Sequence, residues 1–162
     1  MPRGKPGVEI RLNETRLLSE YLAARWTHAR ILIQPRVGLL NPEGESRKLT
    51  WAELRFAGIW RRYPDAVCIT PRRVTIIETS LKPTPAKISL LELYRDLCLV
   101  TEDYAEYRSL PVDLLMVWSL PDTATEVIAR RHGVAVEIFR PAWVDEWLET
   151  LLPRERRAPR VT

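Results

Sequence analysis

Two acidic residues, Asp65 and Glu78, lie in a stretch of the chain that predicts a β-hairpin. Runs rich in valine, isoleucine and threonine stand on both sides of a Pro-Arg pair, and proline at the second position of a type I turn commonly joins two strands. With the turn over Thr70–Arg73, the strands step outward symmetrically and Asp65 falls directly opposite Glu78. Opposed side chains have Cβ atoms roughly 5 Å apart, where like charges repel. The spacing therefore predicts two carboxylates that need a cation between them.

The second strand of this hairpin adds polar groups to the same face. Period-two alternation puts Ser80 and Lys82 on the side of Glu78. Oxygen ligands of this hard kind suit Mg²⁺ or Mn²⁺, which take one or two carboxylates and complete their coordination with water and substrate phosphate. The alternative is that Asp65 simply ends a loop and Glu78 is a solvated strand residue, because a one-residue change in turn length would dissolve the pairing. The sequence leaves both interpretations open.

The dipeptide Pro64-Asp65 and the tripeptide Glu78-Thr79-Ser80 resemble the active-site motif of the PD-(D/E)xK nuclease superfamily, which has the restriction-endonuclease-like fold. In that family, an aspartate on one strand and a Glu-x-Lys on the next bind the catalytic metal. The resemblance implies that Asp65, Glu78 and the backbone carbonyl of Thr79 bind Mg²⁺ or Mn²⁺.

The wider stretch, residues 63 to about 94, is similar to short nuclease-fold proteins of thermophilic phages and mobile elements, but it departs from them at two positions. Ser80 stands where the family has its catalytic lysine, and Leu90 stands where many members have a glutamine four residues before a tyrosine. Lys82 lies two residues further along the strand, and Lys87, near the start of the next helix, is a second candidate. If the site is active, we expect Lys82 to be the relocated catalytic lysine.

The composition sets the class of protein. The chain has 162 residues, of which 46% are apolar, which suffices for one sizeable core, and it contains neither a membrane-length apolar segment nor a secretory leader. Cys68 and Cys98 are too few for a disulfide framework, so we expect both to be buried and reduced. With no glycine-rich phosphate loop, no nucleotide cofactor is expected. We expect a soluble protein of the cytoplasm, or of a virion assembled there.

Basic residues suggest a polyanionic partner. The net charge is +4 and the pI is near 9.3, which is compatible with DNA binding. The candidate DNA-binding residues are the arginine pairs beside and within the hairpin, Arg61, Arg62, Arg72 and Arg73. A run of charges is most often a solvated face, and Arg62 is also a candidate partner for the two carboxylates.

Caps and periodicity predict a single α/β domain over residues 13–152, between a flexible arm at 1–12 and a basic tail at 153–162. The expected elements are a helix from Asn13 or Thr15, a strand over 29–37, a helix over 51–59, the hairpin, a helix capped by Thr84, a buried strand over 111–120, a helix capped by Thr123, a strand over 134–139 and a final helix. The strands within 111–139 should be parallel, with a right-handed crossover. Up to about residue 119, this order is the α-β-β-β-α-β core of the resembled superfamily, with a mixed sheet, and an α-β-α extension follows.

Two further side chains and one acid have alternative roles. Trp143 and Trp147 share one apolar stripe of the final helix, where they anchor either an interface or the core. Glu20, on the first helix, is at a place where the resembled family sometimes has an additional metal ligand, although an exposed helical glutamate is the simpler interpretation.

Three functions remain open. The first is an active Mg²⁺-dependent DNA endonuclease that uses Asp65, Glu78 and Lys82. The second is a nuclease-fold, DNA-associated protein with weakened or lost catalysis, used as a structural or assembly component of a phage particle or DNA-processing complex. Its partners are DNA, another protein or a second copy of the chain. The sequence favours this second hypothesis, because it requires no relocated lysine. The third is an interaction module that binds only protein.

Overall fold

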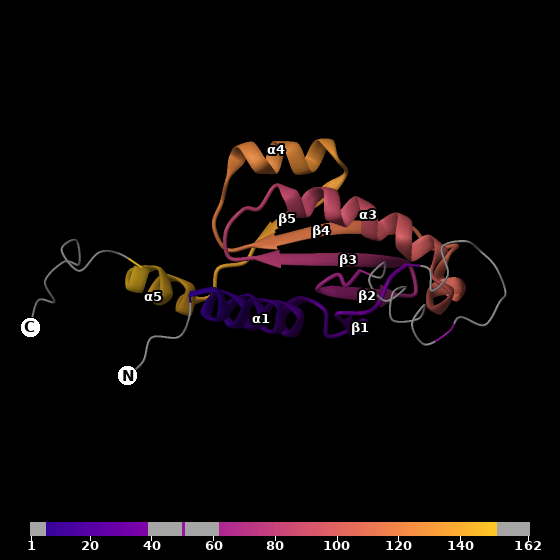
Figure 1. Cartoon of the computed structure of the whole chain (residues 1–162), viewed down its shortest axis with the longest axis horizontal. Helices are drawn as coiled ribbons and strands as arrows, with labels where there is room; N and C mark the ends of the chain where they lie inside the picture. Colours follow the sequence, from indigo (N-terminus) through magenta and orange to yellow (C-terminus); the bar gives the residue numbers. More distant parts are fainter. Residues whose placement is uncertain (1–5, 39–49, 51–61, 152–162) are drawn as a thin grey trace, which may run out of the picture.

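The computed structural model describes residues 6–38, 50 and 62–151, which are built around a five-stranded mixed sheet (Figure 1). In chain order the elements are α1 (Pro6–Arg25), β1 (Arg30–Ile33), β2 (Ala66–Thr70), β3 (Arg73–Ser80), α3 (Ala86–Val100), the 3₁₀ helix η1 (Glu102–Tyr107), β4 (Val112–Trp118), α4 (Thr123–Arg131), β5 (Val134–Ile138) and α5 (Ala142–Leu151). The strands lie in the order β1-β2-β3-β4-β5, antiparallel from β1 to β3 and parallel from β3 to β5. The expected α/β class with a mixed sheet is confirmed.

Helices cover both faces of this sheet. Helices α3 and α4 pack over one face, on side chains such as Ile76 and Met116, while α1 packs over the other face, on Ile77 and Val117. Figure 1 shows α1 on one side of the strands, α3 and α4 on the other, and α5 beyond the first turns of α1. Because successive side chains of a strand point to opposite faces, the continuous apolar runs of β3 and β4 supply both layers of core.

The hairpin has the register that the sequence predicts. Ile69 pairs with Val74 across the turn, and the ladder continues outward until the last pair, after which Asp65 and Glu78 follow. The buried residues of α3, which are Ile88, Leu91, Tyr94 and Cys98, recur at helical spacing. Both cysteines are buried and free, as expected. Likewise, β4 and β5 are parallel and α4 connects them.

The first helix begins earlier than predicted. It starts at Pro6 rather than at Asn13 or Thr15, so residues 6–12 belong to a helix and not to an arm. Proline is well tolerated in the first turn of a helix, and nothing between it and Asn13 interrupts helical hydrogen bonding. The cap signals at Asn13 and Thr15 were therefore misread, and the Thr15 hydroxyl instead donates to the carbonyl of Arg11 within the helix.

The predicted strand over 29–37 is shorter, because β1 ends at Ile33. Gln34 has a φ of 44°, in the left-handed region, and its amide donates to the Asp65 carbonyl. A single bridge between Val37 and Arg62 then resumes the pairing. The left-handed residue turns the chain out of the ladder, which ends regular pairing beside Asp65.

Two helix caps also differ from the prediction. Thr84 makes no cap for α3; its hydroxyl donates to the Lys82 carbonyl instead. Asp122 rather than Thr123 caps α4, accepting a hydrogen bond from the amide of Ala124. Gly133, with a φ of 68°, follows the end of α4, where glycine readily adopts the left-handed conformation. The 3₁₀ helix η1 was not anticipated, and the helix expected over 51–59 lies outside the described residues.

None of the described helices combines the length and the apolar character needed to cross a bilayer.

The cap of α4 gives a direct test of this part of the fold. Asp122→Ala removes the acceptor for the first free amides of α4 and should lower the free energy of unfolding by about 1 kcal/mol. Asp96→Ala is the matched control, because this exposed aspartate lies inside α3 with only its neighbour Arg95 at 3.5 Å. Chemical denaturation should show a smaller change for the control; equal losses would mean that the Asp122 side chain is not acting as a cap.

Candidate active site

Asp65 and Glu78 meet where β2 begins and β3 approaches its end. The amide of Asp65 donates to Glu78 Oε1 at 3.2 Å, and Asp65 Oδ2 accepts from both the amide and the hydroxyl of Thr79, at 2.8 and 2.9 Å. Each carboxylate is thus bound to the backbone of the opposite strand. These hydrogen bonds fix the positions of the two carboxylates relative to one another.

The cation between the two carboxylates comes from α3. Lys87 Nζ lies 3.0 Å from Glu78 Oε2 and 3.7 Å from Asp65 Oδ2, and it donates to the Thr79 carbonyl at 2.6 Å. The side chain of Lys87 is 22% exposed and that of Glu78 is 4% exposed. We call Asp65, Glu78, Thr79 and Lys87 the acidic corner. In the sequence, Lys87 is only a second candidate for the catalytic lysine. The helix start after Pro85 is the signal that could have placed Lys87 first.

The charges of the acidic corner are unbalanced, because two carboxylates share one ammonium. Burial and the neighbouring charge of Asp65 raise the pKa of Glu78 to about 7, although Lys87 acts in the opposite direction. Burial disfavours the ammonium of Lys87, but Asp65 and Glu78 together outweigh that effect and raise its pKa. The excess negative charge makes the corner attract either a proton or a second cation.

Ser80 and Lys82 lie beside the acidic corner but take no part in its hydrogen bonds. The Ser80 hydroxyl donates to Glu14 Oε1 at 3.3 Å and lies 3.1 Å from the Thr84 hydroxyl. Lys82 is exposed, beyond the last residue of β3. Its predicted role as catalytic lysine therefore requires its side chain to reach back toward the carboxylates, which Lys87 already contacts.

Glu14 is an acid that sequence analysis missed. It lies on α1 within reach of Ser80, and its charge also raises the pKa of Lys87. Because the helix was predicted to start at Asn13 or Thr15, Glu14 fell at the end of the predicted helix and was not considered as a site residue. Glu20, considered instead, is engaged elsewhere, since it accepts from Arg16 and from the indole of Trp143.

A groove of about 570 Å³ opens between α1 and the start of the hairpin. Asp65 and Thr79 form part of its wall, so the groove reaches one edge of the acidic corner. Helix α1 contributes a cation, Arg11, and an acid, Glu14, to the same wall. Polar and apolar groups both line the groove, and its size admits an extended chain such as a nucleic-acid backbone or a peptide.

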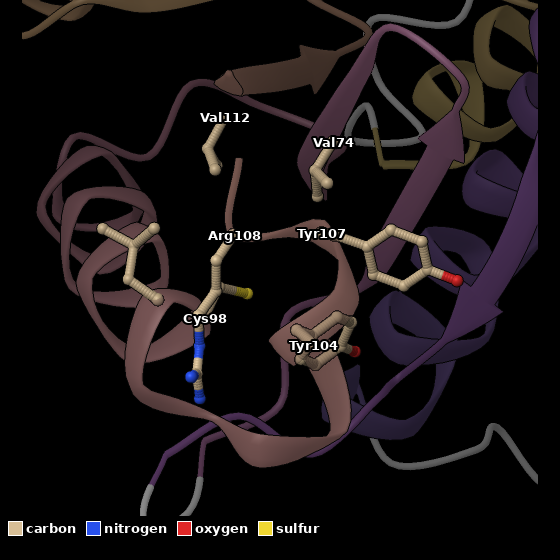
Figure 2. Close-up of a pocket in the computed structure, with 7 residues that line it drawn as sticks. Val74, Cys98, Tyr104, Tyr107, Arg108 and Val112 are labelled. Atoms are coloured by element: carbon tan, nitrogen blue, oxygen red, sulfur yellow. The ribbon is translucent and has the colours of Figure 1, made fainter. Parts of the chain in front are cut away.

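A second hollow carries no candidate chemistry. It lies near the start of β3, between η1 and α3, and Figure 2 shows Val74, Cys98, Tyr104 and Val112 around it. Its volume of about 10 Å³ holds at most one water molecule, and its walls are mostly apolar. We regard it as a packing defect of the core.

The donor set of the acidic corner fits a hard divalent cation. Asp65 and Glu78 supply carboxylate oxygens and Thr79 supplies a carbonyl oxygen, which Mg²⁺ and Mn²⁺ prefer to nitrogen or sulfur. Across the part of the chain that the structure describes, no group of three or more histidine, cysteine, aspartate or glutamate side chains could hold a metal. A cation here would accordingly complete its coordination with water or substrate.

Two of the candidate DNA-binding arginines, Arg72 and Arg73, lie at the hairpin turn, away from the acidic corner. Arg73 is five residues from Glu78, or roughly 17 Å along β3. Arg73 pairs with Asp113 at 2.7 Å. The backbone of Arg62 bridges to Val37, and Arg61 lies outside the described residues.

The two tryptophans of α5 pack against the chain itself. Trp143 is 9% exposed and lies against Leu17 of α1, with the guanidinium of Arg16 at 4.6 Å over its ring. Trp147 is partly buried in the same cluster. These contacts attach α5 to α1, which is the core-packing alternative; an interface role remains a prediction.

No protein-family model, curated protein or solved structure matches this chain.

The raised pKa of Glu78 makes stability depend on pH. Because the folded state binds this proton more tightly than the unfolded chain, the stabilising effect of the protonated form is present below the ordinary value of 4.5 and is lost as the pH rises through about 7. Glu78→Gln is neutral at every pH. Relative to this variant, the wild-type chain should lose about 3 kcal/mol of unfolding free energy between pH 4.5 and 8.

Denaturant titrations at several pH values in the absence of metal check this expectation. Glu106→Gln is the control, since this exposed glutamate of η1 pairs only loosely with Arg30, at 3.7 Å, and should follow the wild type. Parallel curves for wild type and Glu78→Gln would contradict the raised pKa.

Proposed function

We propose that this chain is a DNA-acting protein of the PD-(D/E)xK nuclease class, and that its acidic corner is a Mg²⁺- or Mn²⁺-dependent phosphodiesterase site in which Lys87 replaces the strand lysine missing at Ser80. One observation carries the proposal: two carboxylates, a carbonyl and a lysine ammonium converge at the end of β3, with Lys87 Nζ 2.6 to 3.7 Å from the other three groups. The sequence alone favours weakened or lost catalysis, because that hypothesis requires no relocated lysine. Lys87 removes that objection.

The order of the elements supports the same class. Helix α1, the strands β1 to β3, helix α3 and strand β4 follow the α-β-β-β-α-β order of the resembled restriction-endonuclease-like core, and α4, β5 and α5 follow as an extension. The carboxylates stand on neighbouring antiparallel strands, as that motif requires. Because a fold hosts many functions, this order supports the proposal only together with the site.

The residues of the acidic corner have distinct roles in this proposal. Asp65, Glu78 and the Thr79 carbonyl hold the cation, which when bound polarises the scissile phosphate and lowers the pKa of an attacking water. Lys87 supplies a positive charge that offsets the negative charge developing on the phosphate. The groove along α1 receives the nucleic-acid backbone, and Arg11 on its wall is positioned for a neighbouring phosphate.

A second candidate function rests on the same lysine. Lys87 already satisfies Glu78 and the Thr79 carbonyl without any metal, and Ser80 stands at the family's lysine position. Under this alternative, the chain keeps the fold as a DNA-associated structural or assembly component, for example of a phage particle, with DNA, another protein or a second copy as its partner.

Cleavage of single-stranded and double-stranded DNA with Mn²⁺ separates the two functions. Glu78→Gln should abolish cleavage, and Lys87→Ala should slow it by a factor of roughly 10² to 10³, because one preorganised charge is lost. Lys82→Ala is the matched control and should cleave at the wild-type rate. Persistent cleavage in Glu78→Gln would exclude the acidic corner, and loss in Lys82→Ala but not in Lys87→Ala would restore the lysine that the sequence predicts.

DNA binding is tested separately from cleavage. If the hairpin turn contacts phosphates, Arg72→Ala with Arg73→Ala should weaken DNA retention and lower the slope of log affinity against log salt by about 2. The pair Arg130→Ala with Arg131→Ala changes the net charge equally on exposed positions of α4. Equal effects of both double variants, measured by filter retention at several salt concentrations, would mean that general charge and not the turn binds DNA.

A further inference from the structure

The ammonium of Lys87 lies on the groups that are suited to bind a metal. It donates to the Thr79 carbonyl at 2.6 Å, lies 3.0 Å from Glu78 Oε2 and lies 3.7 Å from Asp65 Oδ2. These three oxygens belong to the three groups that are the candidate metal ligands of the acidic corner. A divalent ion bound by the same three oxygens would therefore have to stand close to the place where Nζ stands.

We propose that Lys87 is a built-in substitute for the metal: in the metal-free chain its ammonium occupies the cation position of the acidic corner, and binding of a divalent ion displaces it. This inference rests on the proposed metal site and adds an order of events to it. The lysine first holds the two carboxylates together and is then released beside the bound ion, where the proposed catalytic role requires it.

The Lys87 ammonium and a divalent ion cannot occupy the cation position together, for reasons of both charge and space. Mg²⁺ binds oxygen at 2.0 to 2.1 Å, so an ion that reaches Glu78 and the Thr79 carbonyl leaves no room for an ammonium within hydrogen-bond distance of both. Two positive charges at such short range in a largely buried site also repel one another strongly, because little water screens them. Lys87 and the ion thus compete for the same oxygens.

The structure also provides a place for the displaced side chain. Lys87 stands in the first turn of α3, its side chain is 22% exposed, and its unbranched stem can rotate freely. Glu14 already attracts the ammonium electrostatically and lies on the wall of the groove. Movement toward Glu14 would exchange one carboxylate partner for another without leaving the charge unpaired.

The movement of Lys87 can be measured directly by amine labelling. Brief reaction with an acylating reagent, followed by peptide mass spectrometry, should show that Mn²⁺ raises the labelling rate of Lys87 several-fold. Exposed Lys82, in the same molecule, is the internal control and should label at an unchanged rate. Labelling of Lys87 that stays constant or falls when Mn²⁺ is bound would overturn the displacement.

Metal affinity supplies the second measurement. In calorimetric titrations with Mn²⁺ alone, Lys87→Met should bind at least tenfold more tightly than the wild type, because no ammonium has to leave. Its melting temperature should be lower than that of the wild type without metal and should rise more when Mn²⁺ is added. The double variant Glu78→Gln with Lys87→Met removes both buried charges, so it should fold without metal and bind no Mn²⁺.

The outcomes distinguish this inference from the proposed function. Equal Mn²⁺ affinity in wild type and Lys87→Met, with unchanged labelling, would overturn the displacement while leaving a metal-dependent site. If Mn²⁺ binds to Lys87→Met but not to the wild type, the ammonium replaces the ion and is not displaced by it. That result would support the role of Lys87 as a substitute for the metal and would favour the non-catalytic candidate function. Absence of binding in both proteins would overturn the inference and the metal site together.

Discussion

Two carboxylates placed across a pair of antiparallel strands impose the constraint on which the acidic corner depends. Asp65 and Glu78 are fixed by hydrogen bonds to backbone amides of the opposite strand, so neither can turn away from the other. Glu78 is also buried, which strengthens their repulsion. Some positive group has to stand between them, and the architecture around the corner supplies it from a third element.

That requirement explains the arrangement of the neighbouring elements. Helix α3 has to begin close to the end of β3 so that its first turn carries Lys87 over the carboxylates, and the short link of residues 81–85 keeps it there. Helix α1 closes the opposite side and brings Glu14 to Ser80. In turn, α5 is attached to α1 through Trp143 and Glu20. The elements farthest apart in the chain thus cooperate to position one small site.

The sequence predicts local pairings well because they depend on neighbours in the chain. The register of the hairpin follows from alternating side chains and the turn, and the buried stripe of α3 follows from helical spacing. The predicted start of α1 was wrong. Asn13 and Thr15 are residue types that often cap helices, and propensity alone cannot distinguish a cap from an interior position. The sequence predicted that the two carboxylates need a cation but did not identify Lys87 as its source, since the contact of Lys87 depends on how α3 crosses the sheet. The approach of Glu14 likewise depends on the docking of α1.

The N-terminus of α3 lacks two of the groups that commonly stabilise a helix end. Its cap residue, Pro85, provides no side-chain hydrogen bond, and no acidic residue stands in the first turn to favour the helix dipole. Helix ends of this kind unfold locally at a small fraction of the cost of global unfolding. The lysine that pairs with the two carboxylates is thus carried by the first turn of a helix and the carboxylates by a hairpin. The charge balance of the corner is therefore coupled to the local stability of one helix end, and any partner that grips or loosens this turn would change the corner without touching it.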